Sequence, residues 1–242
     1  MKRFVVGLVL VKLLLLAAFS LAGCRKAQSP KVETLPVATP TTSPGISDDN
    51  INRPVSEPYT GDLSIFEDKD RAKNLQIDRI MDILKISEGK TVADIGAGSG
   101  WFSVRAAKRT GANGKVFAVE INQDYINHIN ERAKKENLPN IQTILGTEDD
   151  PKLSDNSIDA ALILKTYHEI GQPIKVLEKL RKSFKKDALL GIIDRNGNGD
   201  DHGIRKELVI EETKRAGFTK IDEYDFTKAD EMDYFLVFKI AQ

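Results

Sequence analysis

The residues with the clearest capacity for chemistry lie between Val92 and Gly100, where an apolar strand ends in Asp94 and is followed by glycines at 96, 98 and 100. Glycine lets the backbone turn sharply, and its missing side chain lets a bulky ligand approach the start of the next helix. A turn of this kind after the first strand of an α/β sheet is typical of nucleotide-binding sites. The stretch therefore predicts a binding site with a carboxylate beside it.

The spacing of the glycines separates two classes of nucleotide ligand. The dinucleotide fingerprint G-x-G-x-x-G, started at Gly96, needs a third glycine at the position of Trp101. The observed run is D-x-G-x-G-x-G, from Asp94 to Gly100, and it resembles motif I of the class I S-adenosylmethionine-dependent methyltransferases. S-adenosylmethionine has a sulfonium and no pyrophosphate, so an acidic residue near it is useful. A nicotinamide-dependent oxidoreductase and a turn kept only for strand–helix packing are the alternatives.

The resemblance implies a fold and a cofactor. The family has an α/β, Rossmann-like fold, in which a seven-stranded sheet carries helices on both faces and its last strand runs antiparallel. The expected cofactor is S-adenosyl-L-methionine, and the expected activity is methyl transfer.

Further residues are expected to bind the cofactor. Glu120 closes the second strand, where a carboxylate can accept hydrogen bonds from both ribose hydroxyls of an adenosyl ligand. In the family, an aspartate directly after a glycine commonly contacts the adenine; here that position is Thr147, so we expect the contact to pass to Glu148 or Asp149. The whole expected cofactor site comprises Asp94, Gly96, Ala97, Gly98, Gly100, Glu120, Ile121, Thr147, Glu148, Asp149 and Lys165.

Candidate catalytic residues follow the fourth strand, at the edge where open α/β sheets bind ligands. The sequence there is Lys-Thr-Tyr-His-Glu, and its His168 is interpreted as a base or binder of the substrate, with a structural histidine held under the loop as the alternative. Tyr167 is a candidate hydrogen-bond partner of the substrate. His202, in a glycine-rich loop after the fifth strand, is the third candidate.

No metal site is expected. The residues from Asp194 to Asp200 imitate the start of a calcium loop, but Arg205 stands where a bidentate glutamate is required. The single cysteine, Cys24, excludes an intramolecular disulfide and a multi-cysteine metal site.

Alternating helical and strand patterns predict the elements that position these residues. Helices are expected over 71–85, 101–110, 123–137, 173–186 and 204–216. Strands are expected over 90–95, 115–121, 140–145, 157–164, 188–194, 218–225 and 233–240. Residues 60–242 suffice for one domain of ordinary size.

The N-terminal 24 residues have the layout of a secretory signal, with Lys2 and Arg3 before an apolar run and small residues at the end. The segment Leu-Ala-Gly-Cys ending at Cys24 resembles the bacterial lipoprotein signal, in which cleavage leaves the cysteine as the lipidated first residue. An uncleaved membrane anchor with a cytoplasmic domain is the alternative, because the apolar run outweighs Lys12. We expect a membrane-associated lipoprotein lipidated at Cys24, and mass spectrometry of the processed N-terminus distinguishes the two.

Residues 25–59 contain six of the nine prolines and no periodic apolar pattern, which predicts a disordered or extended tether. S-adenosylmethionine is made in the cytosol, whereas a lipoprotein domain is exported, so the two strongest signals of the sequence point to different compartments. A membrane-tethered binding or accessory lipoprotein that retains the fold without turnover is therefore the second functional hypothesis.

The charge balance limits the possible partners. Lysine plus arginine equals aspartate plus glutamate at 36 each, so the chain has no net field that would attract nucleic acid. We expect a small-molecule methyl acceptor, no nucleic acid, and a monomeric domain.

Overall fold

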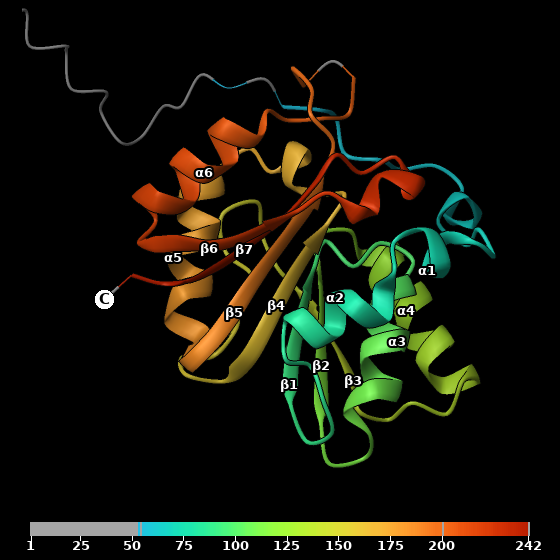
Figure 1. Cartoon of the computed structure of the whole chain (residues 1–242). Coiled ribbons are helices and arrows are strands. Elements are labelled where there is room, and N and C mark those ends of the chain that lie inside the picture. Colours follow the sequence, from blue (N-terminus) through green and yellow to red (C-terminus); the bar gives the residue numbers. More distant parts are fainter. Residues whose placement is uncertain (1–52, 54, 200, 242) are drawn as a thin grey trace, which may run out of the picture. The chain divides into compact units, whose positions relative to one another are not determined.

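The computed structural model describes residues 53, 55–199 and 201–241, all of which lie within one compact unit. The expected signal peptide (1–24) and most of the expected tether lie outside the described residues. The unit is built on a seven-stranded sheet of order β3-β2-β1-β4-β5-β7-β6, with helices on both faces (Figure 1). This confirms the expected fold.

The sheet places the carboxyl ends of its parallel strands along one edge. Strands β1 to β5 pair in parallel, whereas β7 pairs antiparallel with both β5 and β6. Because β1 lies between β2 and β4, the strand order reverses there and leaves a crevice at the carboxyl ends, where ligands bind in open α/β sheets. The strands are β1 Thr91–Ile95, β2 Lys115–Glu120, β3 Ile141–Leu145, β4 Ile158–Leu164, β5 Phe184–Asp194, β6 Phe218–Tyr224 and β7 Tyr234–Ile240.

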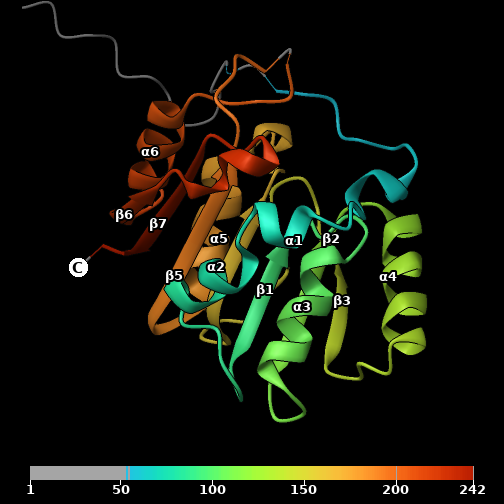
Figure 2. The ribbon, with the colours of Figure 1, turned by 45° about the vertical axis from the view of Figure 1, so that its right-hand side comes forward.

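The helices divide between the two faces of the sheet. One apolar core includes residues of α2, α3 and α4, and the other includes residues of α5 and α6 (Figure 2). Alternate residues of each central strand contribute to opposite cores, as the period of a strand requires. The helices are α1 Arg71–Asn74, α2 Ile77–Ile83, α3 Trp101–Thr110, α4 Gln123–Lys135, α5 Pro173–Ser183 and α6 Lys206–Arg215, with short 3₁₀ helices η1 Leu63–Phe66, η2 Tyr167–Glu169 and η3 Phe226–Asp230.

Three expected elements differ clearly from the structure, one of which is the helix expected over 173–186, which ends at Ser183. The helix expected over 71–85 is broken at Gln76, whose φ of 53° is left-handed. The break lets both Leu75 and Ile77, which are two positions apart, reach the core. The fifth strand starts at Phe184, four residues earlier than expected, because Ile158 of β4 pairs with Phe184.

The N-terminal boundary of the domain also differs from the expectation. Arg53 and Ser56, which the sequence assigned to the tether, are buried against the domain. The backbone N–H of Ser56 donates to the carbonyl of His168 at 3.1 Å, so this segment is part of the fold. Among the described residues, no helix has the length and apolar character needed to cross a membrane.

Candidate functional site

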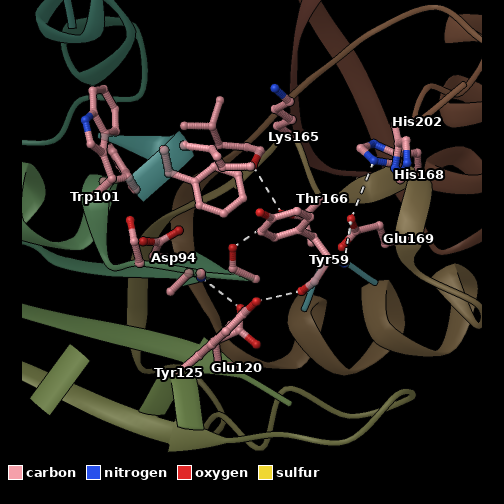
Figure 3. Close-up of a pocket in the computed structure, with 18 of the residues that line it drawn as sticks. Tyr59, Asp94, Trp101, Glu120, Tyr125, Lys165, Thr166, His168, Glu169 and His202 are labelled. Carbon is pink, nitrogen blue, oxygen red and sulfur yellow. Dashed lines mark hydrogen bonds and ion pairs between the residues drawn. The ribbon is translucent and has the colours of Figure 1, made fainter. Parts of the chain in front are cut away.

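Two adjoining cavities of about 330 and 710 Å³ lie at the carboxyl ends of β1, β2 and β4. Figure 3 shows the site, with Asp94 and Trp101 on one side, the two histidines on the other, and Tyr59 between them. Both cavities are lined by the same six residues where they meet, namely Tyr59, Gly96, Glu120, Tyr125, Thr166 and Glu169.

The glycine turn after β1 has a backbone that side chains would disturb. Gly96 has a φ of +71°, and a Cβ placed on it would lie 2.2 Å from the Thr166 methyl carbon. Gly98 has a φ of +54°, but a Cβ placed there would meet no protein atom within 4 Å. Gly98 lines the smaller cavity, so its missing side chain leaves room for a ligand. Gly100 lines neither cavity and instead starts α3 as its N-cap.

Glu120 is fixed at the end of β2 by backbone amides. Its carboxylate accepts hydrogen bonds from the N–H groups of Gly98 at 2.8 Å, Ile121 at 2.9 Å and Asn122 at 3.4 Å. Burial raises the pKa of Glu120, and the three amides act in the opposite direction. An ionised carboxylate offers about four acceptor positions, so Glu120 retains capacity to bind a ligand hydroxyl.

Asp94 places a second buried acid beside the turn. It is 2 % exposed and accepts a hydrogen bond from the Ser103 hydroxyl at 2.6 Å. Burial raises the pKa of Asp94 to about 7, and the nearby Glu120 acts in the same direction, whereas Ser103 and Arg71 oppose it. A cationic ligand in the cavity would favour the ionised form.

The larger cavity extends to the loop after β3. It is lined there by Ile121, Thr147 and Glu148, three of the residues that are expected to bind the cofactor. Asp149 does not line either cavity, and its carboxylate accepts a hydrogen bond from the Thr147 hydroxyl at 2.9 Å. Two other expected residues, Ala97 and Lys165, line the smaller cavity.

His168 combines a structural contact with access to the smaller cavity. Its side chain is 2 % exposed, and its Nδ1 lies 2.8 Å from the Asp194 carboxylate at the end of β5. A carboxylate only accepts, so Nδ1 donates to Asp194, and in the neutral ring Nε2 keeps its lone pair. The structure thus shows the structural contact of His168 through Nδ1, and a role of Nε2 toward the substrate stays a prediction.

His202 and Glu169 complete a polar group around His168. The two imidazole rings meet edge to face, with centroids 5.9 Å apart, and both residues line the smaller cavity. Glu169 Oε1 lies 3.8 Å from His168 Nε2. Burial raises the pKa of Glu169 to about 7, and His168 acts against this shift.

Tyr167, the third candidate catalytic residue, lies elsewhere. It is fully buried and lines neither cavity, and its hydroxyl donates to Glu212 at 2.9 Å. Burial raises its pKa well above the usual value. The structure therefore gives Tyr167 a packing role, because the 3₁₀ helix η2 places it in the core that includes residues of α5 and α6, whereas His168 lines the cavity.

Two tyrosines that the sequence did not single out, Tyr59 and Tyr125, cover the site. The Tyr125 hydroxyl donates to the carbonyl of Tyr59 at 2.8 Å, and the Tyr59 N–H donates to Glu169 at 3.4 Å. These bonds hold the N-terminal segment across the junction of the two cavities. One available signal was that Tyr59 is the first aromatic residue after Phe19.

Residues 86–228, more than half of the chain, match the family described as "Methyltransferase domain". A 2-phytyl-1,4-naphtoquinone methyltransferase of Trichormus variabilis is 28 % identical over 107 residues, which are 44 % of this chain and 47 % of that protein. A demethylmenaquinone methyltransferase of Listeria welshimeri is 24 % identical over 114 residues, or 47 % of this chain and 48 % of that protein. The chain thus spans about half the length of these curated relatives.

Solved structures share the fold. An S-adenosylmethionine-dependent methyltransferase from Aquifex aeolicus superposes with a TM-score of 0.67 at 24 % identity, covering 75 % of this chain and all (100 %) of that one. The cyclase SpnF superposes with a TM-score of 0.61 at 15 % identity, covering 77 % of this chain and 88 % of that one. At these identities the likeness concerns the fold alone. With the family match and the glycine turn beside Glu120, we conclude that the chain belongs to the class I S-adenosylmethionine-dependent methyltransferases.

Proposed function

We propose that this protein transfers a methyl group from S-adenosylmethionine to a small aromatic molecule. The observation that carries the proposal is the open turn at Gly98, whose amide is bonded to Glu120 beside a cavity. The space that no side chain fills and the fixed carboxylate fit the adenosyl and methionyl parts of this donor.

Different parts of the crevice would hold different parts of the donor. Glu120 would accept a hydrogen bond from a ribose hydroxyl, and Ile121, Thr147 and Glu148 would line the adenine. The glycine turn and Asp94 would lie along the methionyl part. Bound there, the donor supplies an electrophilic methyl group on its sulfonium.

The contribution of the protein is to align the two reactants and to exclude water. Alignment in a near-attack geometry lowers a barrier by about 7 to 11 kcal/mol. The segment with Tyr59, bonded to Tyr125 and Glu169, covers the junction of the cavities and would shield the reacting atoms.

The lining of the smaller cavity supports an aromatic acceptor with a polar substituent. Phe66 and Phe102 are among the residues that line it, and His168 and His202 lie at one side of it (Figure 3). The curated relatives are named for naphthoquinone and demethylmenaquinone acceptors, which are ring compounds of this kind.

Calorimetry of the full-length chain with S-adenosylmethionine and S-adenosylhomocysteine tests the proposal. We expect a micromolar site for both ligands. Glu120→Ala removes a charged acceptor, whose hydrogen bonds contribute about 1.5–3 kcal/mol each, so the Kd should rise about 10- to 150-fold. Glu131→Ala, an exposed acid on α4, is the control. Absence of heat with both ligands would refute the proposal, and binding without methyl transfer to any aromatic acceptor would favour the accessory role.

A further inference from the structure

We propose that His168, Glu169 and His202 bind one divalent transition-metal ion at the polar end of the smaller cavity. One ligand atom of each residue lies within 4.8 Å of the others. An ion binds nitrogen and carboxylate oxygen at about 2.0–2.2 Å, so it bridges ligand atoms up to about 4 Å apart. Rotation of the exposed His202 and the half-buried Glu169 can close the remaining gap.

His168 is already oriented as a metal ligand. Asp194, which is completely buried, accepts from Nδ1 of the ring at 2.8 Å and from the backbone N–H of His168 at 3.1 Å. A carboxylate behind a ligating histidine sets the tautomer and makes the other nitrogen a better ligand. Within the described part of the chain, the charged group next to Nε2 is Glu169 at 3.8 Å, which is beyond hydrogen-bond distance.

The donor set selects the class of ion. Two imidazoles and one carboxylate suit zinc, iron, cobalt or nickel, whereas magnesium and calcium prefer oxygen ligands alone. Three protein ligands also leave coordination positions open, as in catalytic zinc sites. The site differs from the calcium loop considered from the sequence, because Asp194 here lies behind a ligand.

The position of the ion points to a role in binding the methyl acceptor, and this role rests on the proposed methyltransferase function. Glu169 lines both cavities, and the two histidines line the smaller one. An open coordination position would therefore face the acceptor and take a hydroxyl or carbonyl oxygen of it. The inferred acceptors are aromatic molecules with an oxygen substituent that can ligate a metal.

Titration of the EDTA-treated full-length chain with Zn²⁺ tests the site by calorimetry. We expect one ion per chain and no comparable heat with Mg²⁺. Loss of a residue that holds a metal ligand in place lowers metal affinity about 10–100-fold. His202→Ala removes a direct ligand and Glu169→Gln weakens one, so each should lower the affinity for Zn²⁺ at least as much. His128→Ala is the matched control, because it removes the third histidine of the chain from an exposed position on α4.

His202 is exposed, so its replacement should leave the thermal unfolding unchanged and keep the comparison valid. Zn²⁺ binding that is equal in the wild type and His202→Ala, or lowered as much by His128→Ala, would overturn the proposal. Zn²⁺ binding without S-adenosylmethionine binding would keep the metal site and refute the proposed function. Binding of S-adenosylmethionine with no Zn²⁺ binding would refute the metal site and keep the proposed function.

Discussion

At the scale of single residues, Gly98 has two separable properties. Its amide holds Glu120, and its missing side chain leaves open space in the smaller cavity. Gly89 offers a comparison, because it also has a positive φ, of +79°, and open space around a Cβ, but it lines neither cavity. Backbone strain and ligand exclusion can therefore be measured separately.

We expect Gly98→Ala and Gly89→Ala to lower the free energy of unfolding by similar amounts. An alanine in the left-handed region costs roughly 1–2 kcal/mol. Only Gly98→Ala should abolish calorimetric binding of S-adenosylmethionine, because its methyl group enters the space that the ligand needs. Equal ligand affinity in the two variants would contradict this assignment of the turn.

At the scale of elements, a buried ion pair joins the N-terminal segment to α6. Arg53 Nη1 lies 2.6 Å from Glu212, and Nη2 donates to the carbonyl of Tyr167 at 2.7 Å. Burial raises the pKa of Glu212, and Arg53 opposes this shift. The pair anchors the segment that carries Ser56 and Tyr59 over the site.

Arg53→Ala should destabilise the domain strongly. Removing one partner of a buried pair costs about 3–5 kcal/mol, because the other charge stays buried without compensation. Urea unfolding measures the loss, and the double variant Arg53→Met/Glu212→Leu should recover much of it. Lys228→Ala is the control, since its pair with Asp225 is exposed and such pairs contribute about 0–1 kcal/mol. A loss no larger than that of the control would show that the segment is not anchored through Arg53.

At the scale of the whole molecule, buried acids at the site link global stability to pH. Burial raises the pKa of Asp94 from 3.8 to about 7 and also raises that of Glu120. Between pH 4 and 7 the folded state therefore binds more protons at Asp94 than the unfolded state, and the contribution of Asp94 to stability falls as the pH rises through this window. Below pH 4 Asp94 is protonated in both the folded and the unfolded state, so it then does not lower the free energy of unfolding.

Asp94→Asn should remove its part of this dependence. The free energy of unfolding of the wild type, measured by urea at several pH values without ligand, should fall relative to that of the variant from pH 4 to 7 and then run parallel to it. Arg71 and Glu120 are the charged groups that act on Asp94, and both remain in the variant. A constant difference between the two curves would refute the raised pKa.

Much of the fold was predictable because its signals are local. The apolar runs of β1, β2 and β4 reflect strands covered on both faces, and their predicted bounds differ from the structure by one residue or less at each end. The prediction of one continuous helix over 71–85 was wrong, because the chain breaks at Gln76. The break buries the residues on either side of Gln76, and the periodic pattern of apolar residues does not reveal it.

The sequence by itself determined the glycine turn and the acid after the second strand, which form the proposed cofactor end of the site. A run of glycines after a buried strand and an acid at the end of the next strand are local features, and strand order brings Gly98 to Glu120. The lipidation at Cys24 also rests on sequence alone and stays a prediction. These features could be predicted because backbone conformation and strand ends depend on neighbouring residues.

Only the tertiary structure decided the other end of the site. Asp194 behind His168, the approach of His202 and Glu169, and the Arg53–Glu212 pair join polar residues far apart in the chain. For the same reason, only the structure shows that Tyr59 lies in the site and that Tyr167 lies outside it. Polar side chains have no periodic pattern, so their partners emerge only when the sheet edge and the covering segment bring them together.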